Sequence, residues 1–173
     1  MTDPIDLADH RAAVAEYLAR ARAISTDRWL VPRGDGKWTP AEETRHLILT
    51  YRAFIADLRG EGTLRLKGTP LLRRIWRFIA LPIILYGRRI PRAVRAPREI
   101  RPEGETGERD PLLLELHRAV FDFEAVFAET CRSSPGKRLT HPFFGELSLR
   151  QAITVAAVHT RHHAAFLPAA PSL

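Results

Sequence analysis

The sequence predicts an all-α protein, a four-helix bundle with an extra helical or extended insert between its second and third helices. Apolar residues recur at helical spacing in four segments of roughly 18–22 residues, and two of these segments begin with helix-capping signals. No alternating apolar and polar pattern of useful length indicates a strand. With 173 residues, 45% of them hydrophobic, the chain is expected to form a single domain over residues 1–173.

The first two helices are separated by a glycine-rich break. The first is expected over residues 4–25, where the apolar positions follow helical spacing. The second begins at Thr39, which can cap the helix, with Pro40 at the first helical position. Glu42 follows three residues after the cap and can complete a capping box. Gly60 is the expected end of this helix.

The last two helices follow the insert. The third is expected over residues 110–131, opened by an Asp-Pro pair. A loop over residues 141–145 leads to Ser148, which with Gln151 three residues later forms a second capping box. The fourth helix is expected over residues 149–166, with a proline shortly beyond it.

Positive charge is concentrated in one part of the chain. The net charge is +7, yet residues 59–101 contain 12 of the 27 basic residues and only 2 of the 20 acidic ones. The protein is therefore a mildly acidic domain with one basic, proline-containing insert over about residues 64–107. The single cysteine, Cys131, excludes an internal disulfide and a metal site built from several cysteines.

The insert has three interpretations. Residues 71–86 are expected to form one helix kinked near Pro82. The favoured interpretation is an apolar helix packed across the bundle or against a second subunit, with its arginines solvated. A peripheral membrane contact through residues 71–92 is the second, because basic and aromatic residues flank an apolar centre. Contact with nucleic acid is the least favoured, since no DNA-reading motif accompanies the charge. Residues 91–97 read as an extended segment that could cover a site.

Histidines on the fourth helix are the most informative candidates for a site. His159 and His163 lie one turn apart on the same apolar face, whereas His162 points elsewhere. Two imidazoles at this spacing are a familiar ligand pair for a divalent metal, and His46 on the second helix is the best third ligand. Spacing alone leaves another explanation open, because a buried histidine is more often hydrogen-bonded than metal-bound.

Two sequence segments resemble signatures of the DinB-like superfamily. The first is Trp-Thr-Pro-Ala-Glu-Glu-Thr-Arg-His-Leu over residues 38–47. The second is His-Pro-Phe-Phe-Gly-Glu-Leu-Ser over residues 141–148, followed by His-Thr-Arg-His-His over 159–163. The resemblance implies an up-down-down-up four-helix bundle with a metal held by His46, His159 and His163, and with His162 outside the ligand set.

The resemblance also implies a class of function. It suggests a metal-dependent hydrolase or a thiol-dependent transferase that acts on a small molecule, with Zn²⁺ or Ni²⁺ and a low-molecular-weight thiol as cofactors. The alternative is a non-catalytic metal-binding or partner-binding module. Three imidazoles leave an open coordination position for water or a thiol. Glu43 and Asp57 are candidate carboxylates behind the ligands, although solvation at the surface is the favoured fate of each. Trp38, Phe143 and Phe144 could line the mouth of the pocket.

We expect a cytoplasmic protein, with a homodimer as one candidate assembly. The N-terminal residues lack the basic start and apolar centre of a signal peptide. No apolar run approaches the roughly 20 residues that a transmembrane helix needs.

Overall fold

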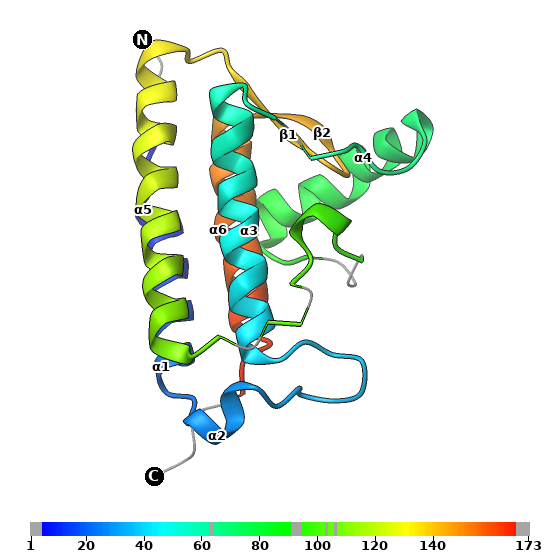
Figure 1. Ribbon diagram of the computed structural model, residues 1–173. Coiled ribbons are helices and arrows are strands. Elements are labelled where there is room, and N and C mark those ends of the chain that lie inside the picture. Colours follow the sequence, from blue (N-terminus) through cyan, green and yellow to red (C-terminus); the bar gives the residue numbers. More distant parts are fainter. Residues whose placement is uncertain (1–4, 63, 91–94, 103, 106, 169–173) are drawn as a thin grey trace.

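The computed structural model describes residues 5–62, 64–90, 95–102, 104–105 and 107–168. In these residues the protein is mostly helical, with one small sheet. The elements in chain order are α1 (Ala8–Arg22), α2 (Thr26–Trp29), α3 (Pro40–Arg59), α4 (Pro70–Gly87), the 3₁₀ turn η1 (Arg98–Ile100), α5 (Arg109–Ser133), β1 (Arg138–His141), β2 (Gly145–Ser148) and α6 (Leu149–Ala164). The four long helices α1, α3, α5 and α6 lie side by side (Figure 1).

Two helix pairs enclose the hydrophobic core. Helix α3 packs against α5, and α1 packs against α6. Fully buried aromatic side chains fill the space between the pairs, among them Tyr17, Tyr51, Phe123 and Phe127. The Phe123 ring is in contact with those of Tyr51 and Phe127, at centroid distances of 5.3 and 5.6 Å. The Tyr51 hydroxyl also contacts Thr160 Oγ1 (2.7 Å), which connects α3 to α6, and both of these helices carry candidate ligands.

Both predicted capping boxes are present. At the start of α3, the Glu42 N–H donates to Thr39 Oγ1 (3.1 Å) and the Thr39 N–H donates to Glu42 Oε2 (2.8 Å). Ser148 and Gln151 make the same exchange at the start of α6. These caps fix where the two helices begin, and they therefore fix which residues face the interior.

Several helix boundaries differ from the prediction, including the end of α1, which lies at Arg22 rather than at residue 25. Helix α1 begins at Ala8 rather than at residue 4, and the Ala8 N–H donates to Asp6 Oδ1 (2.8 Å). Residue 4, the first residue of the predicted helix, lies outside the described part. Helix α6 ends at Ala164, two residues before the predicted end. The short helix α2 was not predicted, because four residues are too few to show a helical period.

The loop predicted over residues 141–145 contains the turn of a hairpin, but the two strands that flank this turn were not predicted. Strands β1 and β2 form an antiparallel hairpin in which Leu139 lies opposite Leu147, and both leucines are buried. Gly145, at the start of β2, has φ +69°, a conformation that favours glycine. Strands of four residues are too short to show an alternating pattern in the sequence. The hairpin is stabilised by burial of this leucine pair against the helices.

The basic insert contains a helix, as predicted, and α4 includes Pro82 within its length. Figure 1 shows α4 projecting outward from the long helices beside the hairpin. Its buried residues are Ala80, Leu81 and Ile84, and it packs on α6. The 3₁₀ turn η1 returns the chain to α3. Among the described residues, no helix has both the length and the apolar character that crossing a bilayer requires.

Candidate metal centre

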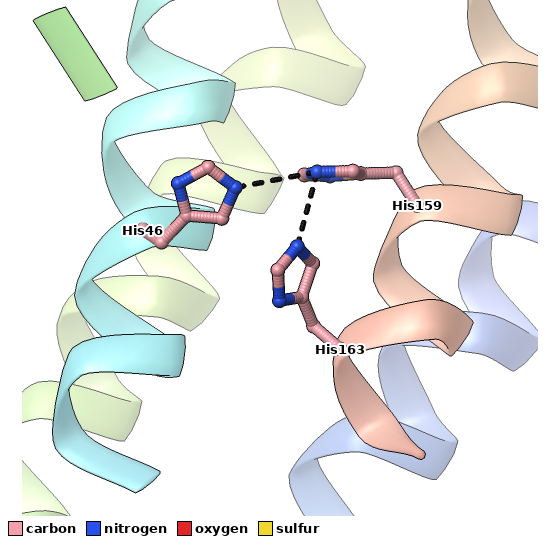
Figure 2. A group of neighbouring side chains, drawn as sticks. All are labelled: His46, His159 and His163. Atoms are coloured by element: carbon pink, nitrogen blue, oxygen red, sulfur yellow. Dashed lines mark hydrogen bonds between the residues drawn. The ribbon is translucent and has the colours of Figure 1, made fainter. Parts of the chain in front are cut away.

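The structure brings together the three histidines that the sequence singled out. His46 extends from α3, and His159 and His163 extend from consecutive turns of α6 (Figure 2). The Nε2 atom of His159 lies 3.3 Å from Nε2 of His46 and 3.1 Å from Nε2 of His163. One ligand atom from each ring lies within 4.8 Å of the other two. His162 is not part of this group, as expected from its rotation about α6.

The outer nitrogens of two of these rings are held by hydrogen bonds. His46 Nδ1–H donates to the carbonyl oxygen of Ile100 in η1 (2.7 Å). His163 Nδ1 lies 2.6 Å from Oε2 of Glu43, and both side chains are almost fully buried. Such contacts to the outer nitrogen fix the orientation of a metal-ligating histidine and its tautomer. They turn the Nε2 lone pairs of both rings toward the centre of the group.

These tautomers leave more lone pairs than protons at the centre. A neutral His46 that donates from Nδ1 has no proton on Nε2. When Glu43 is ionised and accepts from Nδ1 of His163, the same holds for Nε2 of His163. His159 carries at most one proton on Nε2 and cannot donate it in good geometry to both neighbours. With Glu43 ionised, at least one buried lone pair is thus directed at the centre without a proton, which favours a cation there.

The spacing of the nitrogens also fits a metal ion. Tetrahedral Zn²⁺ with Zn–N distances of about 2.0–2.1 Å separates its nitrogen ligands by about 3.3–3.4 Å. The two Nε2–Nε2 separations of 3.1 and 3.3 Å are close to that value. The donor set of three imidazoles suits Zn²⁺ and Ni²⁺ rather than Mg²⁺ or Ca²⁺, which prefer oxygen.

Burial keeps the cluster uncharged in the absence of a cation. Desolvation lowers the pKa of His46 to about 4 and moves the pKa values of His159 and His163 well below the usual range. Desolvation also raises the pKa of Glu43 to about 8. A bound divalent cation would instead favour the charged form of Glu43, together with a proton on Nδ1 of His163.

The metal-free protein should lose stability as the pH is lowered from about 7 to 5.5. The unfolded chain binds protons with an ordinary histidine pKa of about 6.5, whereas the pKa of folded His46 is about 4. The stabilising contribution of each such histidine is therefore complete above about pH 6.5 and is lost as the pH falls toward 4, at about 1.4 kcal/mol per pH unit. The raised pKa of Glu43, about 8, acts in the opposite direction over this range and offsets the contribution of about one histidine.

Urea unfolding in the presence of a chelator measures how the free energy of unfolding of the metal-free protein depends on pH. The His46→Asn variant should show a shallower dependence on pH than the wild type. A free energy of unfolding that does not change over this range would contradict the expectation.

A cavity of about 540 Å³ opens onto the cluster. Aromatic and aliphatic side chains form much of its wall, and the predicted lining residues Trp38, Phe143 and Phe144 are among them. Four basic side chains also line it, and no ion pair is present for any of them among the described residues. These are Arg33, Lys37, Arg95 and Arg101. The Arg33 guanidinium lies over the Phe166 ring, 3.7 Å from its centroid. The cavity thus combines an apolar wall with a positively charged lining.

The two candidate carboxylates have different locations. The expectation that Glu43 is solvated at the surface is wrong, because its side chain is 2% exposed and contacts His163. Asp57 lies away from the cluster, where Oδ2 accepts a hydrogen bond from the Thr140 N–H of the hairpin (2.8 Å). Glu43 comes three residues before His46 on α3. Residues at this spacing share one face of a helix, so the sequence did contain an indication that Glu43 lies near the cluster.

Several contributors to the site were not predicted. The Ile100 carbonyl that orients His46 belongs to the insert, and no sequence pattern marks a backbone acceptor. Arg95 and Pro97 line the cavity, consistent with an insert segment beside the site, although residues 91–94 of that predicted segment lie outside the described part. His141 also lines the cavity, and its ring stacks on Phe144 with a centroid distance of 4.4 Å.

Comparison with known proteins assigns the chain to a family. Residues 9–167 match the DinB superfamily, and this match includes all three clustered histidines and the basic insert. No curated protein and no solved structure matched the chain. Because the match extends over most of the sequence, the chain belongs to the DinB superfamily.

Proposed function

We propose that His46, His159 and His163 bind one divalent metal ion, Zn²⁺ or Ni²⁺, through their Nε2 atoms, and that the protein is a metal-dependent enzyme acting on a small molecule. The observation that carries this proposal is the convergence of three Nε2 atoms whose rings are oriented from behind by Glu43 and a backbone carbonyl. When bound, the ion supplies a Lewis acid that lowers the pKa of a water or thiol ligand.

The surrounding residues have separate roles in this proposal. Glu43 and the Ile100 carbonyl hold two of the rings in their ligating orientation. Trp38 packs against His46 (centroid distance 4.9 Å) and restricts access of water from that side. The basic lining at Arg33 and Arg101 favours a substrate with an anionic group, while the apolar wall accommodates its carbon skeleton.

Two reaction types are consistent with this chemistry. Hydrolysis uses water as the nucleophile, and thiol-dependent transfer uses a low-molecular-weight thiol. Both need one coordination position that the protein leaves open, and three histidines provide such a site. The cavity places this position next to a space large enough for a small molecule.

Cobalt substitution tests whether the bound metal has a coordination position open to added ligands. The protein loaded with Co²⁺ should show a visible absorption spectrum that shifts when azide or a small thiol such as 2-mercaptoethanol is added. The His159→Ala variant, prepared in the same way, should not give that spectrum. A wild-type spectrum that no added ligand perturbs would indicate a closed, structural site and would favour a non-catalytic metal-binding module.

We also propose an up-down-down-up order for the four long helices, which the colour gradient of Figure 1 supports. In that view α1 and α6 descend, whereas α3 and α5 ascend. This order places α3 and α6 so that each can direct histidines toward a shared interior. A single domain over residues 1–173 and a cytoplasmic location complete the proposal.

A further inference from the structure

Helix α4 exposes an apolar face to solvent. Six of its large hydrophobic side chains are exposed, and Phe78 and Tyr86 are 67% and 84% exposed. We call these residues the outer face of α4; they are Leu71, Leu72, Ile75, Phe78, Ile79 and Tyr86. They are either adjacent or about one or two helical turns apart, and hence share one side of the helix. Contiguous apolar surface of this kind usually marks a site of association.

The opposite side of α4 is fixed to the body of the protein. Ala80 and Ile84 are buried there, and together with Trp76 they also line the cavity that holds the histidines. The guanidinium of Arg77 donates from Nη1 to the backbone carbonyl oxygen of Phe144 (3.0 Å). Helix α4 is therefore apolar on both sides, with Ala80, Leu81 and Ile84 buried against the protein and the outer face exposed. An ordinary surface helix presents polar side chains to solvent instead.

The charge around the outer face indicates which kind of partner can bind there, a second copy of the chain or a lipid surface. Helix α4 contains three arginines and no acidic residue, and Arg88 and Arg89 follow directly at its C-terminal end. Arg74 and Arg89 are exposed. If two copies paired through this face, basic residues would meet basic residues at both ends of the helix, and the repulsion would oppose association.

An anionic lipid surface can accept both the apolar side chains of the outer face and the basic residues at the ends of the helix. We propose that the outer face of α4 lies on the surface of an anionic membrane, with its apolar side chains at the boundary between headgroups and acyl chains. Arginines at both ends of the helix are then positioned for the lipid phosphates, and Phe78 and Tyr86 for the interfacial layer where aromatic rings concentrate. The helix lies on the membrane and does not cross it.

Vesicle binding of the full-length protein tests this proposal. The probes are vesicles of phosphatidylcholine alone and vesicles in which about one third of the lipid is phosphatidylglycerol. Co-sedimentation should show at least about tenfold stronger binding to the anionic vesicles, and added salt should weaken it. Absence of binding to the anionic vesicles, or equal binding to both kinds, overturns the proposal.

A matched pair of variants assigns the binding to α4. The double variant Phe78→Ser, Ile79→Ser should bind anionic vesicles at least about tenfold more weakly. Phe121→Ser is the control, because Phe121 lies on α5 and is 68% exposed, nearly the same as Phe78. It should bind like the wild type. All replaced side chains are exposed, so the thermal midpoints of both variants should match that of the wild type.

Two results would count against a lipid surface. Equal vesicle binding by the wild type and the double variant would show that the outer face is not involved. A wild-type dimer that the double variant converts to a monomer, without wild-type binding to vesicles, would identify a second copy of the chain as the occupant. Sedimentation velocity of the same preparations makes that measurement.

Discussion

Replacing His159 with alanine is expected to lower the affinity for Zn²⁺ or Ni²⁺ by more than about 100-fold. Loss of a residue behind a ligand typically costs 10–100-fold, and this change removes a direct ligand of the proposed site. His159 is the best position for the test, because its Nε2 atom lies within 3.3 Å of both neighbouring Nε2 atoms. Metal analysis after purification, followed by titration with a competing chelator, measures the change.

The matched control is His162→Ala on the same helix. His162 lines the cavity but lies outside the three-histidine group, so its loss should leave the metal content unchanged. The thermal midpoint of the metal-free His159→Ala protein should not fall, because the removed imidazole faces other acceptor nitrogens. Equal metal content in the wild type, His159→Ala and His163→Ala would contradict the proposed site.

Glu43→Gln is expected to weaken metal binding by about 10–100-fold. Glutamine keeps the size of the side chain and can accept a hydrogen bond from Nδ1 of His163. It cannot supply the negative charge that stabilises a cation bound through the other side of the ring. Glu43→Ala removes the acceptor as well and should weaken binding further.

A second histidine–carboxylate pair provides the control for this change. His10 Nδ1 lies 3.0 Å from Oε1 of Glu124, while His10 Nε2 contacts the Tyr51 hydroxyl (2.9 Å), and this pair is not part of the three-histidine group. Glu124→Gln should thus leave metal affinity unchanged. If it reduced affinity as much as Glu43→Gln, the effect would be a general one on the fold, and Glu43 would have no specific role behind His163.

Much of the fold could be predicted from local signals. Thr39 with Glu42, and Ser148 with Gln151, mark helix starts because a side chain only three residues away satisfies an otherwise unpaired N–H. The family resemblance rested on segments that include these caps, and the match over residues 9–167 confirms it. The hairpin was missed because its strands are four residues long, and only packing against the helices reveals the paired leucines.

The histidine network around Tyr51 shows a similar limit. The contact of His10 with Tyr51 joins α1 to α3. The Tyr51 hydroxyl also lies 2.7 Å from Thr160 Oγ1 on α6. These residues are 41 and 109 positions from Tyr51 along the chain, so no local spacing could have indicated the contacts. The network connects three helices directly beside His159.

Residue type and helical period were enough to name His46, His159 and His163, since a helix repeats every 3.6 residues and places positions four apart on one face. They did not determine the surroundings of those rings. The burial of Glu43, the carbonyl of Ile100 and the arginines beside the cavity come from segments separated by tens of residues. Their positions follow from how the helices and the insert pack, and packing depends on the whole chain rather than on any local pattern.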